Sequence, residues 1–502
     1  MKETQSSKLN TNGLLPRPPI VVILGHVDHG KTTLLDYIRK TSVVSREAGG
    51  ITQSIGAYEI AHTPISINQS DQHKSVAHKI TFIDTPGHEA FSKMRARGAN
   101  VADLAVLVVA ADDGVKPQTK EVIDVLKETK TPFIVAINKI DKNNANIEGT
   151  KQDLMKNEVF LEGAGGNISW QEISAKTGEG VDKLLDLILL TAEFEELTYN
   201  PESPAKGVII EAKMDSRRGF TVMGVLRDGI LKSGDKIKTT TAIGKIKILE
   251  NFLGEKVSEL SPSSPVLILG FENLPQIGEE FVSSHEGGEI LSTENAEEIS
   301  VAEKVEMEIQ PADKNKKINL ILKADVSGSL EALSGIIKTM PDTNIISESV
   351  GEITDGDVKS AQNTSAVIIG FKSRINKAVE NMARVQNIEI INSEIIYEVI
   401  KTLEEKIQSL KTPPPLAELT VLAIFSQKGK KQLVGGKVDS GTLKMNSPVK
   451  IFRGEEELGR GKISDLHRGK QDATQINAGE ECGVMIESDL QIAVGDRLIH
   501  QS

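Results

Sequence analysis

The most restrictive feature of this sequence is the segment Gly25–Thr32, which reads G-x-x-x-x-G-K-T. It directly follows the apolar run Ile20–Leu24 and precedes the helix-like segment 33–40. A strand, a glycine-rich turn and a helix in this order are typical of a phosphate-binding loop, because backbone N–H groups and the positive end of the helix dipole attract phosphate. We therefore expect an α/β nucleotide-binding domain, with Lys31 on the β- and γ-phosphates and the Thr32 hydroxyl on Mg²⁺.

Three further motifs each follow a strand-like apolar segment: D-T-P-G at Asp84–Gly87, N-K-I-D at Asn138–Asp141 and S-A-K at Ser174–Lys176. Asp141 can accept hydrogen bonds from N1 and the 2-amino group of guanine, a donor pair that adenine lacks, so the motif predicts GTP and GDP rather than ATP. The predicted nucleotide-binding residues are Gly25, His26, Val27, Asp28, His29, Gly30, Lys31, Thr32, Thr33, Asp84, Thr85, Pro86, Gly87, His88, Asn138, Lys139, Asp141, Ser174, Ala175 and Lys176.

Two residues near these motifs are candidates for metal binding and catalysis. Thr52 lies between the first two phosphate motifs, where a threonine can bind Mg²⁺ from a loop that the γ-phosphate orders. Asp84 is expected to hold the same ion through water, and His88 is the candidate for orienting the attacking water. The alternatives are an ordinary loop threonine and a solvated loop histidine.

The 502 residues are too many for one compact core, and the pattern of apolar, β-branched and glycine residues changes several times along the chain. Runs of apolar residues separated by helices predict α/β layers, whereas short β-branched strands with glycine turns predict barrels. We expect a multidomain α/β plus β protein with a P-loop GTPase domain, a β-barrel, an α/β sandwich domain, a connecting helix and a C-terminal β-barrel. The expected parts are a disordered tail (1–17), a GTP-binding domain (18–197), a β-barrel domain (204–290), an α/β domain (312–392), a linker helix (393–412) and a C-terminal β-barrel (416–502).

The two barrel segments share short motifs in the same order, such as Gly244–Ile246 with Gly461–Ile463. We interpret them as two copies of one barrel. Between the α/β domain and the last barrel, Glu394–Lys411 has one apolar helical face and is followed by three prolines, which end the helix. This helix is either a stiff spacer or a helix packed on a core.

Composition limits the kinds of partner that the chain can bind. Lys and Arg number 59 against 71 Asp and Glu, which gives a net charge of −12 and argues for local rather than extensive contact with nucleic acid. The segment 416–502 carries 12 basic and 12 acidic residues, so it is the least acidic large piece. One cysteine excludes a disulfide framework within the chain and fits a cytoplasmic location, and no segment resembles a secretory signal or a membrane span.

The motifs together resemble a translational GTPase, and narrower segments closely resemble bacterial translation initiation factor two. The resemblance covers nearly the whole chain. It is carried by Gly25–Thr33, Glu47–Tyr58, Asp84–His88, Phe91–Gly98, Val108–Val115, Asn138–Asp141, 322–329 and 480–484.

The resemblance implies a function and partners. The C-terminal barrel would hold the formylmethionyl end of initiator tRNA through Arg468, Glu481, Cys482 and Gly483, although Cys482 has the alternative of an ordinary buried barrel cysteine. The factor would place that tRNA on the small ribosomal subunit, promote joining of the large subunit and act with other initiation factors as a monomer, away from membranes. Val27 and Ile51 would form an apolar gate beside His88, and the ribosome would stimulate hydrolysis. The alternative is a specialised elongation or ribosome-assembly GTPase.

Three features depart from the family pattern. Gly469 stands where the family usually has an aromatic residue after the arginine that matches Arg468. The segment 62–79 is longer than the usual hairpin, and we expect a surface elaboration there. The long N-terminal extension of many members is nearly missing, so we expect a short form.

Overall fold

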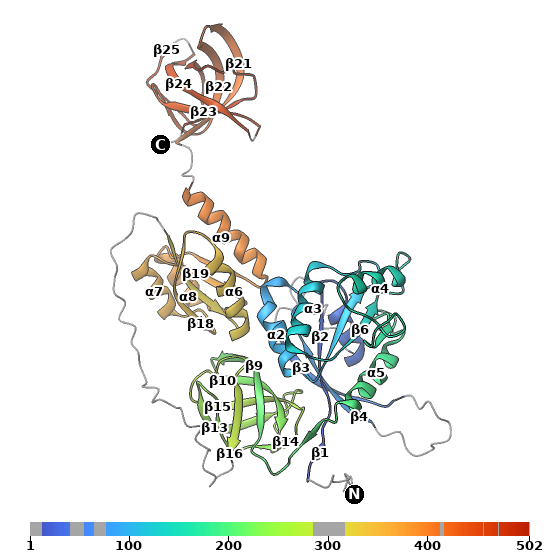
Figure 1. Ribbon diagram of the computed structural model, residues 1–502. Helices are drawn as coiled ribbons and strands as arrows, with labels where there is room; N and C mark the ends of the chain where they lie inside the picture. The colour runs from blue at the N-terminus through green and yellow to red at the C-terminus, as the bar shows by residue number, and fades with distance from the viewer. Residues whose placement is uncertain are drawn as a thin grey trace. The chain divides into compact units, whose positions relative to one another are not determined.

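The computed structural model describes residues 13–40, 55–64, 77–284, 317–411, 416–454, 456–469 and 471–500. The chain divides into two compact units, Met1–Ile400 and Lys401–Ser502. The first unit holds two α/β domains and a barrel, and the second holds another barrel (Figure 1).

The first α/β domain contains a six-stranded sheet in the order β3-β4-β2-β5-β6-β7, with β3 antiparallel to β4 and all other neighbours parallel. Both β2 and β5 are buried over their whole length, as their unbroken apolar sequences predict. The elements are β2 (Ile20–Gly25), α1 (Lys31–Arg39), β3 (Gly56–His62), β4 (His78–Asp84), the 3₁₀ turn η2 (Glu89–Phe91), α2 (Ser92–Val101), β5 (Leu104–Ala110), α3 (Pro117–Thr129), β6 (Phe133–Asn138), α4 (Ile147–Lys156), β7 (Trp170–Glu172) and α5 (Val181–Phe194).

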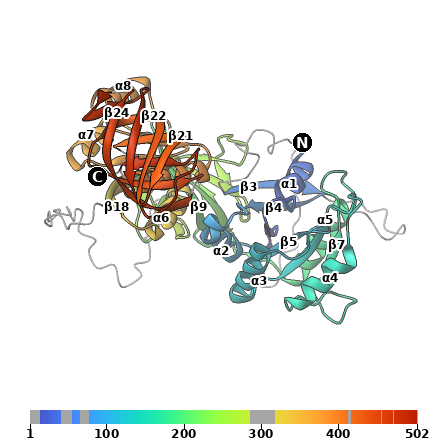
Figure 2. The same ribbon diagram turned by 90° about the horizontal axis from the view of Figure 1, so that it is seen from above.

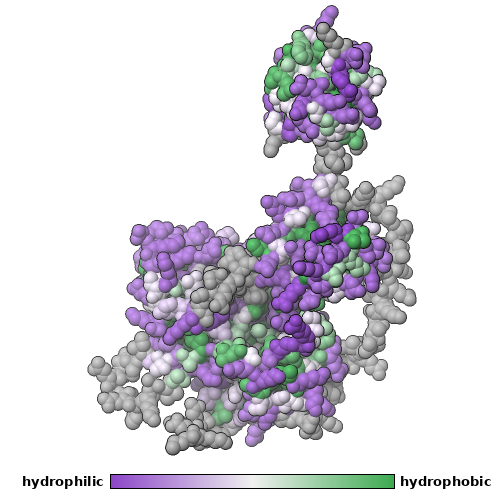
Figure 3. Space-filling view, turned by 180° about the vertical axis from the view of Figure 1, so that it is seen from behind, coloured by the Kyte–Doolittle hydropathy of each residue, from purple (hydrophilic) through white to green (hydrophobic). Residues whose placement is uncertain are grey.

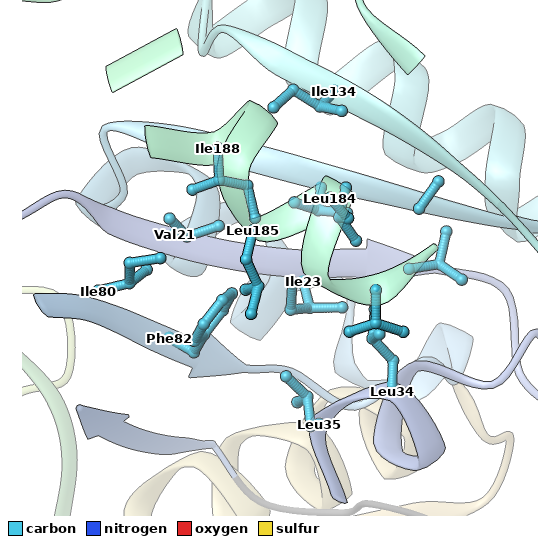
Figure 4. Packing of buried hydrophobic residues seen from close by; sticks show 14 of the residues in the cluster. Val21, Ile23, Leu34, Leu35, Ile80, Phe82, Ile134, Leu184, Leu185 and Ile188 are labelled. Carbon is cyan, nitrogen blue, oxygen red and sulfur yellow. The ribbon is translucent and has the colours of Figure 1, made fainter. Parts of the chain in front are cut away.

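The main core of this domain lies between the sheet and the helices α1 and α5. Val21 from β2 and Phe82 from β4 pack with Leu34 from α1 and Leu184 from α5, and all four are fully buried (Figure 4). Burying each side chain of this size contributes about 1.5–3 kcal/mol. On the other face α2 packs closely against Val22 of β2, and α3 also contacts β2. The sheet therefore holds the end of β2, from which Gly25–Thr32 begins, between two packed layers.

Part of the segment predicted as a disordered tail is ordered. Leu15–Pro16 forms β1, which pairs antiparallel with β8 (Thr198–Tyr199). The Arg17 guanidinium donates two hydrogen bonds of 2.6 Å to the Asp103 carboxylate, and both side chains are more than 90% buried. A buried bidentate ion pair of this kind fixes the backbone beside it. The prediction of disorder over 1–17 is therefore wrong for 15–17, whereas 1–12 lies outside the described residues.

The first barrel is closed, with the cyclic strand order β10-β15-β13-β12-β16-β9. It contacts the first α/β domain, where the Thr81 hydroxyl donates to the Ser263 carbonyl (2.6 Å). The barrel segment contains β9 (Lys206–Asp215), β10 (Gly219–Asp228), β11 (Leu231–Lys232), β12 (Lys236–Lys238), β13 (Ile243–Glu250), β14 (Glu259–Leu260), β15 (Pro265–Phe271) and β16 (Glu280–Ser284).

The second α/β domain has four parallel strands in the order β18-β17-β19-β20. Its helix α6 meets α2 of the first domain through the ion pair of Arg97 with Glu331 (2.5 Å), and Figure 2 gives a second view of these elements. The elements are β17 (Ile318–Ala324), α6 (Ser327–Thr339), β18 (Thr343–Val350), α7 (Asp355–Thr364), β19 (Val367–Phe371), α8 (Lys377–Val385) and β20 (Ile390–Ser393).

Helix α9 (Ile396–Lys411) follows β20 and is packed along one face. Ile396, Val399 and Leu403 are fully buried, and Ile407 is 7% exposed. The burial of Ile396 and Val399, which belong to the first unit, favours packing of the first turn of the helix over a fully solvated spacer. The three prolines that follow the helix lie outside the described residues.

The C-terminal barrel repeats the strand order of the first barrel. Its order β21-β28-β23-β24-β27-β22, closed by the pairing of β21 with β22, matches that of the first barrel when the six main strands are taken in sequence. The fold class predicted from the sequence is thus confirmed. The elements are β21 (Ala417–Lys428), β22 (Lys431–Lys444), β23 (Pro448–Arg453), β24 (Glu456–Arg468), β25 (Gln471–Asp472), β26 (Gln475–Asn477), β27 (Glu481–Glu487) and β28 (Arg497–His500).

Hydrophilic residues cover most of the face drawn in Figure 3. Among the residues that the structure describes, none of the helices has the length and apolar character needed to cross a membrane. The core of the expected surface elaboration, 65–76, and the segment 285–316 lie outside the described residues.

Candidate functional site

A cavity of about 490 Å³ lies in the first unit, where the loops that follow β2, β4 and β6 meet the loop after β7. Carboxyl ends of parallel strands are the usual place for a ligand site in an α/β sheet. The cavity is lined by Val27, Asp28, Gly30, Lys31, Thr32, Thr33, Gly87, His88, Asn138, Lys139, Asp141, Lys142, Ala175, Lys176 and Tyr397. All four sequence motifs therefore contribute to one cavity.

The Lys31 side chain lies inside the phosphate loop. Its Nζ donates to the carbonyls of Gly25 (2.8 Å) and His26 (2.7 Å). Burial lowers the pKa of the Lys31 amine to about 8, while the Asp84 carboxylate opposes this shift and Arg95 adds to it. A Cβ at Gly87 would lie 2.3 Å from this Nζ and 3.2 Å from the Val27 backbone N, so a larger residue there would displace the amine.

The third and fourth motifs are joined to the phosphate loop and to each other. The Asn138 side-chain amide donates to the His29 carbonyl (2.8 Å), and its oxygen accepts from the Ala175 N–H (2.9 Å). The Ser174 hydroxyl donates to the Asp141 carboxylate (2.7 Å), which also lines the cavity. This network fixes the Asp141 carboxylate, the group predicted to read guanine.

Several predicted nucleotide-binding residues lie behind the cavity wall. The Thr85 hydroxyl is fully buried and donates to the Ile23 carbonyl (3.1 Å). His29 is also fully buried, and burial lowers its pKa to about 4, so its 3.7 Å contact with Asp113 joins a neutral imidazole to a carboxylate and is not an ion pair. The predicted residues outside the lining are Gly25, His26, His29, Asp84, Thr85, Pro86 and Ser174.

His88 lies at the edge of the cavity and is held from several sides. Its Nδ1 accepts from the Ala90 N–H (3.1 Å), and its carbonyl accepts a hydrogen bond from the Arg95 guanidinium. Burial lowers the pKa of the His88 imidazole, the nearby Glu89 opposes the shift, and Arg95 adds to it. The ring is therefore neutral at pH 7, and the Ala90 contact places its proton on Nε2.

Two predicted residues, Ile51 and Thr52, lie outside the described residues. The other gate residue, Val27, lines the cavity and donates its N–H to the Gln118 side chain (3.0 Å). Within the described ranges no group of three or more His, Cys, Asp or Glu side chains is placed to hold a metal ion. A magnesium ion that keeps several waters and binds mainly to phosphates and one or two protein oxygens needs no such cluster. Thr32 lines the cavity and has a hydroxyl oxygen of the kind such an ion binds, whereas Asp84 lies outside the lining, as a carboxylate that acts through water can.

The residues expected at the tRNA end occupy neighbouring strands of the C-terminal barrel. Arg468 ends β24 and pairs with Glu480 (2.6 Å) rather than with Glu481. Glu481 and Gly483 alternate with Cys482 on β27, and Cys482 belongs to the barrel core. Burial raises the pKa of its thiol to about 11. The strand alternation therefore turns the Cys482 side chain inward, as in the alternative of a buried barrel cysteine, and its part in holding the tRNA end stays a prediction.

Two cavity residues were not predicted from the sequence. Lys142 follows Asp141 directly, so the motif itself could have indicated it. Tyr397 comes from α9, more than 200 residues beyond the last motif, and no local pattern points to it.

Three family models match parts of this chain. The elongation factor Tu GTP binding domain matches residues 17–193, elongation factor G domain 2 matches 204–284, and Translation-initiation factor 2 matches 292–404. "Translation initiation factor IF-2" of Thermosipho africanus strain TCF52B is 42% identical, with 97% of this chain and 71% of that protein covered. The protein of the same name from Synechococcus sp. strain RCC307 is 38% identical over 97% of this chain, which spans 45% of its length. A crystal structure of GDP-bound aIF5B from Aeropyrum pernix is 28% identical, with 97% of this chain and 92% of that chain covered and a TM-score of 0.48.

Proposed function

Because this chain belongs to the translation initiation factor 2 family, we propose that it is a GTPase that binds formylmethionyl initiator tRNA and promotes ribosomal subunit joining. It would position the tRNA on the small subunit, and the ribosome would stimulate GTP hydrolysis. The large and small subunits and other initiation factors would be its partners, and it would work as a monomer in the cytoplasm.

The observation that carries the GTPase proposal is the meeting of all four nucleotide motifs in one cavity. Lys31 would contact the β- and γ-phosphates, and the Gly87 N–H would detect the γ-phosphate. Asp141 would accept from the guanine N1 and 2-amino groups, in the orientation that its contact with Ser174 fixes. Thr32 and Thr52, together with Asp84 through water, would hold Mg²⁺, which supplies positive charge against the phosphates when bound.

The proposed reaction is an in-line attack of water on the γ-phosphate. His88 would orient the water, and Lys31 would stabilise the charge that develops on the phosphate oxygens. Val27 and Ile51 would keep His88 away from the water until the ribosome rearranges the loops. GTP would order the segments around Thr52 and Gly87, and hydrolysis would release them and let the factor leave.

We predict that nucleotide binding takes up protons at alkaline pH. With a pKa of about 8, most Lys31 amines are neutral at pH 8.5, and bound phosphates would raise that pKa and protonate them. The affinity for GDP is then highest at a pH well below 8, where Lys31 is protonated, and it falls as the pH rises above 8. Calorimetry in buffers of different ionisation enthalpy is expected to show about half a proton or more taken up per nucleotide at pH 8.5, and about a tenth of a proton at pH 7. No uptake at pH 8.5 would contradict the role of Lys31.

The tRNA-binding proposal is supported by an accessible stretch of backbone on β27. A Cβ added at Gly483 would meet only His467, at 3.7 Å, so a ligand can approach the strand closely there. Arg468 ends the neighbouring strand and supplies a positive charge that can pair with the phosphates of a tRNA end. Gly469 follows it in a left-handed conformation (φ 63°), which explains glycine in place of the aromatic residue found in the family.

Protection of the aminoacyl ester tests this proposal. We expect the full chain to slow hydrolysis of formylmethionyl initiator tRNA and to protect the unformylated form much less, at a fixed salt concentration. Arg468→Ala is expected to weaken protection about fivefold to tenfold, whereas Arg460→Ala, an exposed arginine on the same strand, leaves it unchanged. Equal protection of the two tRNA forms would contradict the initiation role.

A further inference from the structure

A tyrosine from outside the first α/β domain touches the proposed catalytic histidine. The rings of His88 and Tyr397 lie edge to face, with centroids 4.4 Å apart and planes at 79°. Tyr397 also lines the nucleotide cavity, and the residue is 40% exposed. The nucleotide site is therefore built partly from the first turn of α9.

The helix turn that carries Tyr397 is packed and is hydrogen-bonded to the end of β20. Its neighbours Ile396 and Val399 are fully buried. The hydroxyl of Ser393, at the end of β20, donates to Glu398 (2.5 Å) and accepts from the Ile395 N–H (3.1 Å). The start of α9 is thus joined to the sheet, and the position of the Tyr397 ring follows the position of that domain.

The arrangement of His88 is unsuited to accepting a hydrogen bond from water. Its Nδ1 lone pair is used by the Ala90 N–H, and the neutral ring then carries its proton on Nε2, which can only donate. To accept from a water, the imidazole must give up the Ala90 contact and turn. An edge-to-face aromatic contact of the kind made with Tyr397 opposes that turn.

We propose that Tyr397 is a positioning residue that holds His88 in its resting orientation, so that hydrolysis in the free protein is slow until α9 withdraws. This inference rests on the proposed GTPase function. The second α/β domain thereby controls the water-orienting residue of the first through one ring contact.

Single-turnover GTP hydrolysis without ribosomes tests the proposal. An edge-to-face pair contributes about 0.5–1.5 kcal/mol, so Tyr397→Ala is expected to raise the rate about 2- to 13-fold. Tyr397→Phe keeps the ring and is expected to match the wild type, as is Glu404→Ala, an exposed position on the same helix. The increase should vanish when His88→Ala is combined with Tyr397→Ala. An unchanged or lower rate in Tyr397→Ala, or an increase that persists without His88, would overturn the proposal.

Nuclear magnetic resonance titration of the nucleotide-free protein gives a readout that does not depend on activity. Tyr397→Ala is expected to raise the pKa of His88 towards 6.5, because the substitution removes part of the burial that lowers this pKa. The charged and titratable groups around the ring stay the same in this variant; they are Glu89, Arg95 and His26. Tyr397→Phe is expected to leave the pKa where it is. An unchanged pKa in Tyr397→Ala overturns the proposed contact. A wild-type chain that hydrolyses no GTP even with ribosomes would instead contradict the proposed function while leaving this titration interpretable.

Discussion

Replacing Asp141 by asparagine is expected to lower the affinity for GTP and GDP by about a hundredfold to ten-thousandfold. The carboxylate would lose two charge-assisted hydrogen bonds to guanine, each worth about 1.5–3 kcal/mol. The introduced amide can still accept from the Ser174 hydroxyl, so the loop should keep its position. Equilibrium titration with a fluorescent GDP analogue measures the loss.

Xanthosine triphosphate supplies the matched control for Asp141→Asn. Its base has a carbonyl oxygen in place of the guanine 2-amino group, so the introduced amide can donate to it and affinity should shift towards this nucleotide. Asp153→Asn, on the surface helix α4 and outside the cavity lining, is expected to bind GDP as the wild type does. Unchanged affinity for GDP in Asp141→Asn would contradict the assignment of the guanine site.

Replacing His88 by alanine is expected to lower ribosome-stimulated hydrolysis by about a hundredfold to ten-thousandfold, the range that a positioned acid–base group contributes. The loss should fall on kcat, because Lys31 and Asp141 remain to bind the nucleotide. His78→Ala provides the control, since His78 is an exposed histidine at the start of β4. The rate of phosphate release with excess ribosomes is measured for the His88→Ala and His78→Ala variants. A fully active His88→Ala variant would exclude His88 from the reaction.

The position of the nucleotide site was predictable because short consecutive segments of the sequence form it. Gly25–Thr32, Asp84–Gly87 and Asn138–Asp141 each follow a buried strand of the same sheet, and the carboxyl ends of those strands meet at one edge. Likewise, the motifs that the two barrel segments share in the same order predicted two copies of one barrel, and the two barrels have the same strand order. Local sequence was sufficient where function and fold depend on the same few consecutive residues.

Other features depend on residues far apart in the chain. Arg17 is held in place by its ion pair with Asp103, and the ring of His88 is in contact with the ring of Tyr397. No pattern in the sequence around Asp103 or Tyr397 indicates these contacts. Strand β18 is only partly buried and lacks an apolar run, so its own sequence gives little sign of a strand. Helix α7 did carry a signal, the capping box of Thr354 with Asp357, but it has few apolar residues to show its period.

The orientation of Cys482 shows that a family motif does not predict which way a side chain points. The family resemblance marks the segment 480–484 as a unit but does not say which face of β27 each residue occupies. Pairing with β22 and β24 places Cys482 in the core with Val484 and leaves Gly483 on the other face. Matching a motif by position therefore identifies the strand, whereas the sheet register identifies the side chains that a ligand can reach.

Phosphate release on subunit joining tests the central proposal most directly. The full chain with GTP would be mixed with small ribosomal subunits carrying formylmethionyl initiator tRNA, and large subunits would then be added. A GTPase of initiation predicts a rise in the rate of phosphate release of about a thousandfold or more on addition of the large subunits, as activators of slow GTPases produce. A rate that stays the same when large subunits are added would contradict it.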